Sequence, residues 1–452
     1  MGVIQMSDVV SSIGINQAEL LRKIKFRIIP LAFILYFFNG LDRANLSYAA
    51  LGMNPALGIS TVVFGTISSM FFIGYLIFQI PSNLLLQRIG ANKLIPTIVI
   101  LWGIFTCLMF YVQAGSHVMT LRFLIGVAEA GFFPGMIFYF TLWFPARERA
   151  QITALFFLSG PVAGLIAGPM SGWIVQNANW MGYEGWRWLF MVEGVPTVLL
   201  GALAYFTLKD GPQFVKWLTK DESRWLIREL NTEKESIGKV EKLSFRNVIA
   251  NGTLWRLAMI YMFVQAANQA LMMWLPSLIK EFHVGLTTVH VGYLMMIPNF
   301  IALFALPLWG THSDNTGERK MHVALPILVI GISMITFLLA GNFVVLIISL
   351  VIFGLGQFSY FGTYWTLPPK LLSPAVLAVG IALINSCSSF GGFMGNYVVG
   401  YANHLAGTTG VFVYMTLLAF ASFFLLITMK ISKDAPKKEQ AAAAQASADA
   451  VA

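Results

Sequence analysis

Long apolar runs, separated by short polar connections, repeat along this chain of 452 residues. Each run is about 20 residues long, the length at which an α-helix spans the hydrocarbon core of a bilayer and pairs its own backbone polar groups there. Hydrophobic residues make up 57% of the chain and charged residues only 11%. A soluble domain carries about 25% charged residues. The runs show no period-two alternation, which argues against a transmembrane β-barrel. The sequence therefore predicts an all-α integral membrane protein.

Twelve such segments are expected, in two groups of six. An N-terminal six-helix half is predicted at 28–208 and a C-terminal half at 254–430. A cytoplasmic linker loop at 209–253 joins them. This loop is too polar to span the membrane and should form one or two amphipathic helices at its surface. A polar cytoplasmic segment, 1–27, precedes the first half, and a disordered tail, 431–452, follows the second. The individual segments are predicted at 28–48, 61–85, 94–113, 119–140, 152–175, 188–208, 254–279, 289–309, 322–340, 343–367, 376–399 and 411–429.

Lysine and arginine gather in alternate connections, as the positive-inside rule requires of loops on the cytoplasmic side. The other connections are nearly bare, with Lys280 as the main exception and Arg187 at a boundary. Both termini are therefore predicted to be cytoplasmic, in an inner membrane, and the net charge of +9 follows from this asymmetry and does not indicate nucleic-acid binding. The basic residues predicted on the inner side, besides those of the linker, are Arg22, Lys23, Lys25, Arg27, Arg88, Lys93, Arg147, Arg149, Arg319, Lys320, Lys370, Lys430, Lys433, Lys437 and Lys438.

Four charged residues stand out inside the predicted helices: Asp42 and Arg43 in the first, and Arg122 and Glu129 in the fourth. Arg122 and Glu129 lie about two turns apart on one helix face. Charges inside a bilayer are costly and rare, which favours a functional role. Burial favours the protonated form of a carboxyl, so Asp42 and Glu129 are the candidate proton-coupling residues. One arginine is expected to hold a substrate carboxylate and the other to pair with Asp42 or Glu129, because a guanidinium keeps its charge and binds carboxylates bidentately. Static ion pairs that hold helices together are the structural alternative.

The second half has no comparable charges within its helices. Neutral amides could read substrate hydroxyls there, although each is equally well interpreted as a helix-packing residue. Glycines at 160, 164, 168 and 172 predict a smooth groove for a neighbouring helix. The candidate amides are Gln265, Asn268, Gln269, Asn299, Gln357, Asn385 and Asn396.

Several other classes of function lack their sequence signals. The six histidines fall in or near loops without metal-ligand spacing, and the chain carries neither a phosphate-binding P-loop nor a nucleophile elbow. Cys107 and Cys387 lie inside apolar runs and are interpreted as packing residues. The N-terminus shows no cleavable signal peptide. We therefore expect no enzyme activity, no metal and no cofactor, with protons as the coupling ion.

The connection after the eighth predicted segment carries the pattern G-x-x-x-D-x-x-G-x-[RK]-[RK], which resembles the loop signature of the major facilitator superfamily. The copy in the first half departs from it, with Asn83 in place of the glycine and Gln87 in place of the aspartate. The residues of the second-half motif, which is expected to act in conformational change, are Gly310, Asp314, Gly317, Arg319 and Lys320.

Six further stretches resemble the anion:cation symporter branch of that superfamily, which includes bacterial permeases for tartrate, sugar acids, phthalate and hydroxyphenylacetate. The resemblance covers nearly the whole chain. The stretches are LDRANLSYA (41–49), IPSNLLLQRIGANK (80–93), LRFLIGVAEAGFFPGMIFYFTLWFP (121–145), GWRWLFMVEGVPTVLLG (185–201), WLTKDE (217–222) and SDNTGERKMH (313–322).

The resemblance implies import of an organic acid together with protons, by alternating access between two halves. It ties Asp42 to proton coupling and makes Glu129 a second protonation site. It favours Arg43 for the substrate carboxylate and Arg122 for the acidic network, a distinction that the residues alone leave open. In the family, the substrate pocket is lined at the positions of Tyr75, Trp365 and Asn385.

A sugar acid, a tartrate-like diacid and an aromatic acid would all need the same arginine, so the substrate is expected to be one of these small organic acids. The other expected partners are protons and the lipid bilayer, and a monomer is the default. An organic-anion exchanger or a uniporter is the first alternative. A transporter-fold receptor is a more distant one, because the linker and the tail look too short for a signalling domain.

Overall fold

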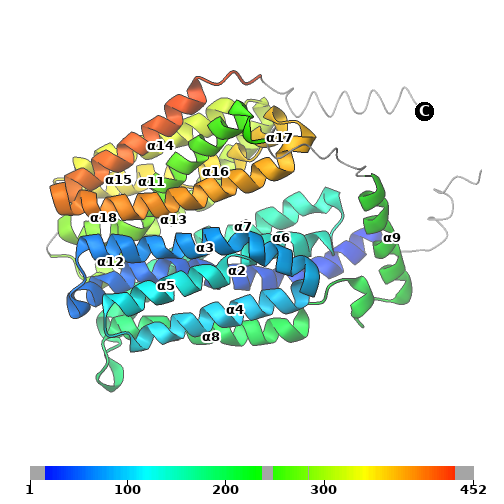
Figure 1. Ribbon diagram of the computed structural model, residues 1–452, viewed down its shortest axis with the longest axis horizontal. Helices are drawn as coiled ribbons and strands as arrows, with labels where there is room; N and C mark the ends of the chain where they lie inside the picture. Colours follow the sequence, from blue (N-terminus) through cyan, green and yellow to red (C-terminus); the bar gives the residue numbers. More distant parts are fainter. Residues whose placement is uncertain (1–15, 237–247, 283–284, 433–452) are drawn as a thin grey trace, which may run out of the picture.

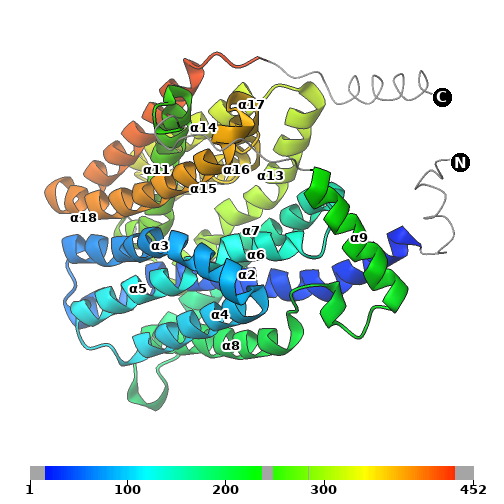
Figure 2. The same ribbon diagram turned by 45° about the vertical axis from the view of Figure 1, so that its right-hand side comes forward.

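The computed structural model describes residues 16–236, 248–282 and 285–432, and all regular structure within these ranges is helical. Figures 1 and 2 show two layers of long helices, the N-terminal half (blue to green) against the C-terminal half (green to red). The N-terminal half consists of α2 (Gln17–Leu57), α3 (Thr61–Ile89), α4 (Ala91–Leu108), η1 (Met109–Tyr111), α5 (Gly115–Glu129), α6 (Phe132–Thr141), α7 (Ala146–Asn177), η2 (Trp180–Gly182) and α8 (Gly185–Thr207). The linker contains η3 (Pro212–Phe214) and α9 (Lys220–Ser236). The C-terminal half consists of α11 (Gly252–Phe282), α12 (Thr288–Leu294), α13 (Met296–Thr316), α14 (Lys320–Leu338), α15 (Phe343–Gly356), α16 (Ser359–Tyr364), α17 (Leu367–Leu371) and α18 (Pro374–Ile427).

Ten helices in the described ranges are long and apolar enough to cross a membrane. The last of them, within α18, contains two non-helical residues, Ala406 and Gly407, where the chain turns back on itself (Figure 1). The predicted segments 376–399 and 411–429 lie on the two arms of this turn. The count of twelve and the cytoplasmic placement of the termini stay predictions, as do the domain boundaries. The predicted tail lies almost wholly outside the described residues.

The helix predicted at 119–140 is broken after Glu129 into α5 and α6. Pro134 has no backbone N–H, so the carbonyl of Ala130 cannot make its regular helical bond. The first helix is longer than predicted, because Asn16 caps α2 by accepting a hydrogen bond from the Glu19 N–H at 3.3 Å. The break places the Glu129 side chain at the end of a helix, near the middle of the bundle.

The linker helix α9 is bound to the N-terminal half. It crosses one end of the bundle (Figure 1), and its acidic residues form ion pairs with basic residues at the ends of α2 and α7. Leu226 and Leu230 on the same helix are buried. The predicted amphipathic helix is therefore present. The ion pairs are Lys23–Glu222 (3.0 Å), Arg147–Glu229 (2.8 Å) and Arg149–Glu233 (2.9 Å).

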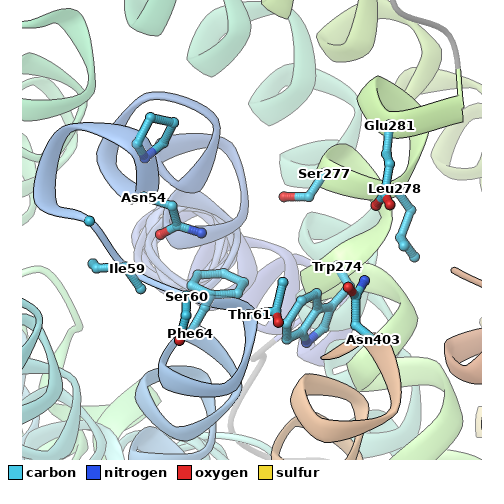
Figure 3. Close-up of a pocket in the computed structure, with 12 residues that line it drawn as sticks. Asn54, Ile59, Ser60, Thr61, Phe64, Trp274, Ser277, Leu278, Glu281 and Asn403 are labelled. Carbon is cyan, nitrogen blue, oxygen red and sulfur yellow. The ribbon is translucent and has the colours of Figure 1, made fainter. Parts of the chain in front are cut away.

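The two halves meet closely at the opposite end of the bundle, which we call the closed end. A Cβ atom added to Gly65 would lie 2.8 Å from the Cα of Gly400, and one added to Gly168 would lie 2.2 Å from the carbonyl oxygen of Gly292. Main chains thus touch without intervening side chains, as the glycine spacing of α7 predicted. A pocket of about 450 Å³ also lies at this end (Figure 3), lined by Asn54, Pro55, Gly58, Ile59, Ser60, Thr61, Phe64, Trp274, Ser277, Leu278, Glu281 and Asn403.

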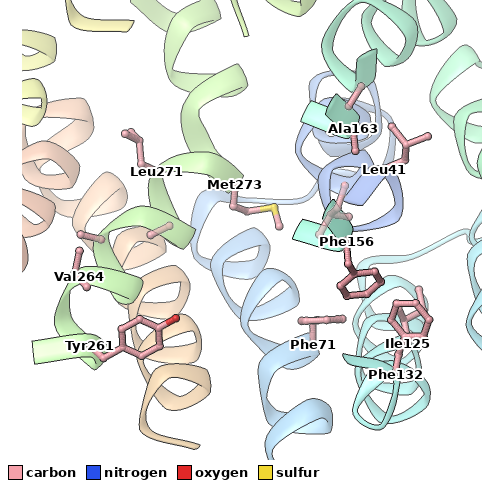
Figure 4. Close-up of a cluster of buried hydrophobic side chains, with 14 of the residues drawn as sticks. Leu41, Phe71, Ile125, Phe132, Phe156, Ala163, Tyr261, Val264, Leu271 and Met273 are labelled. Atoms are coloured by element: carbon pink, nitrogen blue, oxygen red, sulfur yellow. The ribbon is translucent and has the colours of Figure 1, made fainter. Parts of the chain in front are cut away.

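Below the closed end, the core is a continuous cluster of buried apolar side chains. Figure 4 shows Phe71 and Phe156 of the N-terminal half on one side and Tyr261 and Met273 of α11 on the other. Phe157 of α7 also meets Phe361 of α16, with ring centroids 5.2 Å apart. This aromatic layer surrounds the charged residues described next.

Candidate functional site

Arg43 and Glu129 form an ion pair between α2 and α5, with Arg43 Nε 2.9 Å from Glu129 Oε2. Asn39, about one turn before Arg43 on α2, donates its Nδ2 to the same oxygen at 2.8 Å. The Glu129 side chain is fully buried, and its other oxygen has no hydrogen-bond partner among the described residues. The structure thus joins one predicted arginine to one predicted proton-coupling residue.

Two aromatic rings of α3 flank the Arg43 guanidinium. Its carbon lies 5.1 Å from the centroid of Phe71 and 5.5 Å from that of Tyr75, within the range of cation–π attraction. The guanidinium of Arg122 lies 5.1 Å from the same Phe71 ring. Phe71 therefore contacts both cations, and Tyr75 stands beside Arg43 as predicted for a pocket residue. We call Arg43, Glu129, Asn39 and these two rings the arginine site.

The two arginines differ in access. The Arg43 side chain is 38% exposed, whereas Arg122 is 2% exposed. Arg122 has no ion pair within the part of the chain that the structure describes, and its Nε has no hydrogen-bond partner there. Of the two arginines, Arg43 is therefore the more accessible one in this conformation.

Asp42 lies next to Arg43 in the sequence but faces away from it, because consecutive residues of a helix point about 100° apart. Its Oδ2 accepts hydrogen bonds from Trp102 Nε1 of α4 at 2.6 Å and from Thr197 Oγ1 of α8 at 3.3 Å, and its Oδ1 accepts one from Asn45 Nδ2 at 3.3 Å. Asp42 is 1% exposed. The static ion pair of Asp42 with an arginine, which the sequence left as an alternative, is not formed in this conformation.

Aromatic residues connect the arginine site to the C-terminal half. Tyr36 of α2 lies in the neighbourhood of Arg43 and Tyr75, and Tyr261 of α11 lies in the neighbourhood of Tyr36. The ring of Tyr261 meets that of Trp365 edge-on, with centroids 5.3 Å apart. Trp365 therefore packs against a tyrosine of α11 that lies near Tyr36, and its role as a pocket residue stays a prediction.

The other C-terminal candidates divide into groups. Asn385 is half-buried on α18, and no hydrogen bond of its side chain joins it to the arginine site among the described residues. Tyr360 is buried and donates a hydrogen bond from its hydroxyl to Gln265 Oε1, which joins α16 to α11. Gln357 is 1% exposed, and both polar atoms of its side chain lack partners in the described part. Asn299 and Asn396 bond to main-chain carbonyls of their own helices and are packing residues.

Two buried polar residues were missed by the sequence analysis. Asn39 carried only the weak signal of an amide in an apolar run. Glu193 of α8 is 1% exposed and lies inside the predicted segment 188–208, so it carried the same signal as Glu129: an acid within a membrane helix. It was passed over because it has no oppositely charged residue on its own helix face.

The loop motif of the second half forms a compact turn. Arg319 Nη1 lies 2.6 Å from Asp314 Oδ1, and Gly317 ends α13 with a left-handed φ of 64°. Gly310 lies on α13 and Lys320 begins α14. In the first half, where the motif aspartate is replaced by Gln87, Asp210 from the linker accepts a hydrogen bond from the Asn92 N–H at 2.8 Å. A carboxylate from the linker thus accepts a main-chain hydrogen bond in the first-half loop, which lacks the motif aspartate.

A scan against protein families matches residues 32–396 to the Major Facilitator Superfamily. The chain belongs to the major facilitator superfamily. It is 38% identical to a protein of Agrobacterium vitis named as a tartrate transporter, over 93% of each chain. It is 33% identical to a protein of Acinetobacter baumannii named as a quinolone resistance transporter, over 91% of this chain and 94% of that protein. The inward-open xylose transporter XylE of Escherichia coli shares the fold, with a TM-score of 0.73, 16% identity, and coverage of 92% of this chain and 99% of that chain.

This major facilitator protein is therefore a multi-pass membrane transporter for a small organic substrate, and not an enzyme. The superfamily assignment and the all-helical fold predicted from the sequence are confirmed.

Proposed function

We propose that this chain is a proton-coupled symporter of the inner membrane that imports an organic carboxylate by alternating access. The observation that carries the proposal is the state of Arg43: a partly exposed side chain, beside two aromatic rings, whose one ionic partner among the described residues is Glu129. The site lies within a single chain, so a monomer would suffice for this cycle.

Competition between the Glu129 carboxylate and the substrate carboxylate for Arg43 couples proton binding to substrate binding. While Glu129 is charged, its carboxylate occupies Arg43. When Glu129 takes up a proton, the ion pair is lost and the guanidinium can bind a substrate carboxylate through two hydrogen bonds. Arg122 acts on Glu129 through space and keeps the surroundings positive when the anion is absent. Proton binding and anion binding thus favour each other, which is what symport requires.

Access to the site comes from one side at a time. The halves touch at the closed end, so we infer that substrate reaches Arg43 from the end that carries α9, which is the predicted cytoplasmic end. The conformation described here is then the one that releases substrate and proton inward. Separation of the glycine contacts would open the arginine site to the outside.

The lining favours a hydroxylated or aromatic acid. Tyr36, Tyr75, Tyr261 and Trp365 offer ring faces and hydroxyl groups, and the amide of Gln265 lies on the C-terminal side. The name of the relative from Agrobacterium vitis supports a tartrate-like acid within that class. Sugar acids and aromatic acids fit the same arginine.

The test is the thermal stability of the purified protein with a panel of organic acids at two pH values. A ligand that binds only the folded state raises the melting temperature. We expect one class of acid to stabilise the protein, more strongly at the lower pH, and Arg43→Lys to lose most of the shift because lysine lacks the planar fork. A neutral or cationic compound that stabilises the protein where no acid does would refute the proposal.

Exchange or uniport of the same anion is the alternative. Uptake into proteoliposomes with and without an imposed pH gradient distinguishes them, because only symport accumulates the acid in response to the gradient. An Asp42→Asn variant that keeps exchange but loses gradient-driven uptake would support symport. Outward pumping would appear in the same assay as depletion of acid preloaded on the cytoplasmic side.

A further inference from the structure

Glu193 is a buried acid that the cycle described above does not use. It lies on α8, packed against α2 and α7, and is 1% exposed. Its Oε1 accepts a long hydrogen bond of 3.4 Å from Ser171 Oγ, and its Oε2 has no hydrogen-bond partner among the described residues. A charged carboxylate held this way in an apolar interior is costly, since neither a cation nor a full set of donors compensates for the lost water.

Glu193 and Asp42 belong to one polar cluster, which we call the acid pair. Thr197, one turn after Glu193 on α8, donates to Asp42. Asn45 donates to Asp42 Oδ1 and also faces Glu193, while its own Oδ1 lacks a partner in the described part of the chain. Two unpaired oxygens, one on Glu193 and one on Asn45, therefore belong to neighbouring side chains. A proton on Glu193 would remove the uncompensated charge from its carboxyl group.

The charged and titratable groups around the acid pair do not supply a direct counter-ion. Arg122 and Glu129 of α5 act on Asp42 through space, and Cys107 of α4 interacts with it as well. Tyr48 of α2 interacts with Glu193. From α7 the one polar contact to Glu193 among the described residues is the hydroxyl of Ser171. Two neighbouring carboxylates in such a place cannot both stay ionised.

The two members of the acid pair are not equivalent. Asp42 accepts hydrogen bonds from Trp102 and Asn45, and Thr197 shares its one hydroxyl proton between Asp42 and the main-chain carbonyl of Glu193. The Glu193 carboxyl accepts a single long hydrogen bond, so Asp42 is the better place for a charge. The contacts thus assign the charge to Asp42 and the proton to Glu193 in this conformation. No atom of the pair touches the guanidinium of Arg43 among the described contacts, so a substrate bound there would leave the pair in place.

We propose that Glu193 carries one of the transported protons, as the proton-holding member of a site that is separate from the arginine site. This inference rests on the proposed proton-coupled function. In the outward-open state the proton binds to the Glu193 carboxylate as O–H, and it is still held there in the conformation described here. The same O–H bond breaks, and the proton passes to water on the cytoplasmic side, once water reaches the acid pair and solvates the second charge. Nothing else is consumed.

The experiment measures the number of protons taken up per carboxylate transported, in proteoliposomes with a pH-sensitive dye and a radiolabelled acid. Glu193→Gln is expected to retain exchange of the acid across the membrane and to lose one proton per carboxylate relative to the wild type. Ser171→Ala, which removes the hydroxyl contact but keeps the carboxyl, is the matched control and is expected to keep the wild-type ratio. An unchanged ratio in a folded, exchanging Glu193→Gln protein would overturn the inference.

Other outcomes separate this inference from the proposed function. If the wild type takes up no protons with any transported acid, the proposed function itself fails. If a sodium gradient drives uptake and Glu193→Gln abolishes that dependence, the pair binds sodium, and the proton assignment is wrong. Should Glu193→Gln fail to fold, Glu193→Asp serves instead, since it keeps a carboxyl group on a side chain one methylene shorter. We expect this variant to keep the wild-type number of protons per carboxylate and to change the pH dependence of uptake. An unchanged pH dependence would count against a role for Glu193.

Discussion

The contact between α7 and α12 at the closed end yields the sharpest prediction. A Cβ atom on Gly168 would lie 2.2 Å from the carbonyl oxygen of Gly292, far inside ordinary van der Waals contact. The obstructing atom belongs to the main chain, so a change of rotamer cannot relieve the clash. Gly168→Ala should therefore destabilise the conformation described here and leave the one open at this end untouched.

The magnitude follows from the cost of overpacking. An extra methyl group in a well-packed interior costs about 1–3 kcal/mol, which corresponds to a shift of about 5–150-fold between the two conformations. Alanine also favours a helix over glycine by about 1 kcal/mol in both conformations, so this term cancels. Gly160 lies on the same helix, and a Cβ atom added to it would have no neighbouring atom within 4 Å, which makes Gly160→Ala the matched control.

The assay is thiol labelling from the outside of intact cells, with a reagent that does not cross membranes. Ser69 is fully buried on α3, one turn beyond Gly65, and Ser69→Cys places a thiol where it is reached only after the closed end opens. We expect faster labelling with Gly168→Ala than with the parent, and no change with Gly160→Ala. Equal labelling rates for the two alanine variants would refute the assignment of this contact as the outer seal.

Three further predictions concern stability. Partial burial raises the pKa of Glu222, but hydrogen bonds from the Thr219 N–H and from Lys23 outweigh the burial and hold this pKa below its usual value. The stabilisation that Glu222 provides is therefore present above the pKa of the unfolded state and is lost as the pH falls through the pKa of the folded state. The melting temperatures of wild type and Glu222→Gln should converge in acid, and a widening gap between them would contradict the prediction. Asp210→Ala removes the acceptor for the Asn92 N–H and should cost about 0.5–2 kcal/mol of unfolding free energy, with Asp210→Asn losing less in the same denaturation assay. Arg187→Lys should lower the free energy of unfolding by about 1.5–3 kcal/mol. The reason is that the guanidinium donates hydrogen bonds to the main-chain carbonyls of Phe110 and Val112, each at 2.7 Å, and a lysine retains one of these bonds. An unchanged melting temperature would show that both bonds are dispensable.

The helices and their order could be predicted from the sequence, because apolar length alone specifies a spanning segment. The rotation of each helix about its axis could not. Asp42 and Arg43 are neighbours in the sequence, yet one faces α4 and α8 and the other faces α3 and α5. Which way a residue points depends on helices that pack from far along the chain, and the sequence contains no local record of this.

The same limit explains which site residues were found. An ion pair between one arginine and Asp42 or Glu129 was anticipated, because opposite charges in lipid must meet. The family resemblance favoured Arg122 for this role, so the pairing of Arg43 with Glu129 was not anticipated. The contact of Trp102 with Asp42 was not, because a tryptophan in an apolar run looks like any packing residue until its N–H is seen to donate at 2.6 Å. Glu193 could have been found, since an acid inside a membrane helix is informative even without a partner.

The glycine contacts at the closed end also determine what can regulate opening. Main chain meets main chain there, and no ion pair joins the two halves at this end in the described ranges. Among the described residues, the glycine contacts themselves carry no charged group on which salt or pH could act directly. The helices can separate there without breaking an ion pair. What drives their separation has to arise at the arginine site, where protons and substrate change the charge around Arg43.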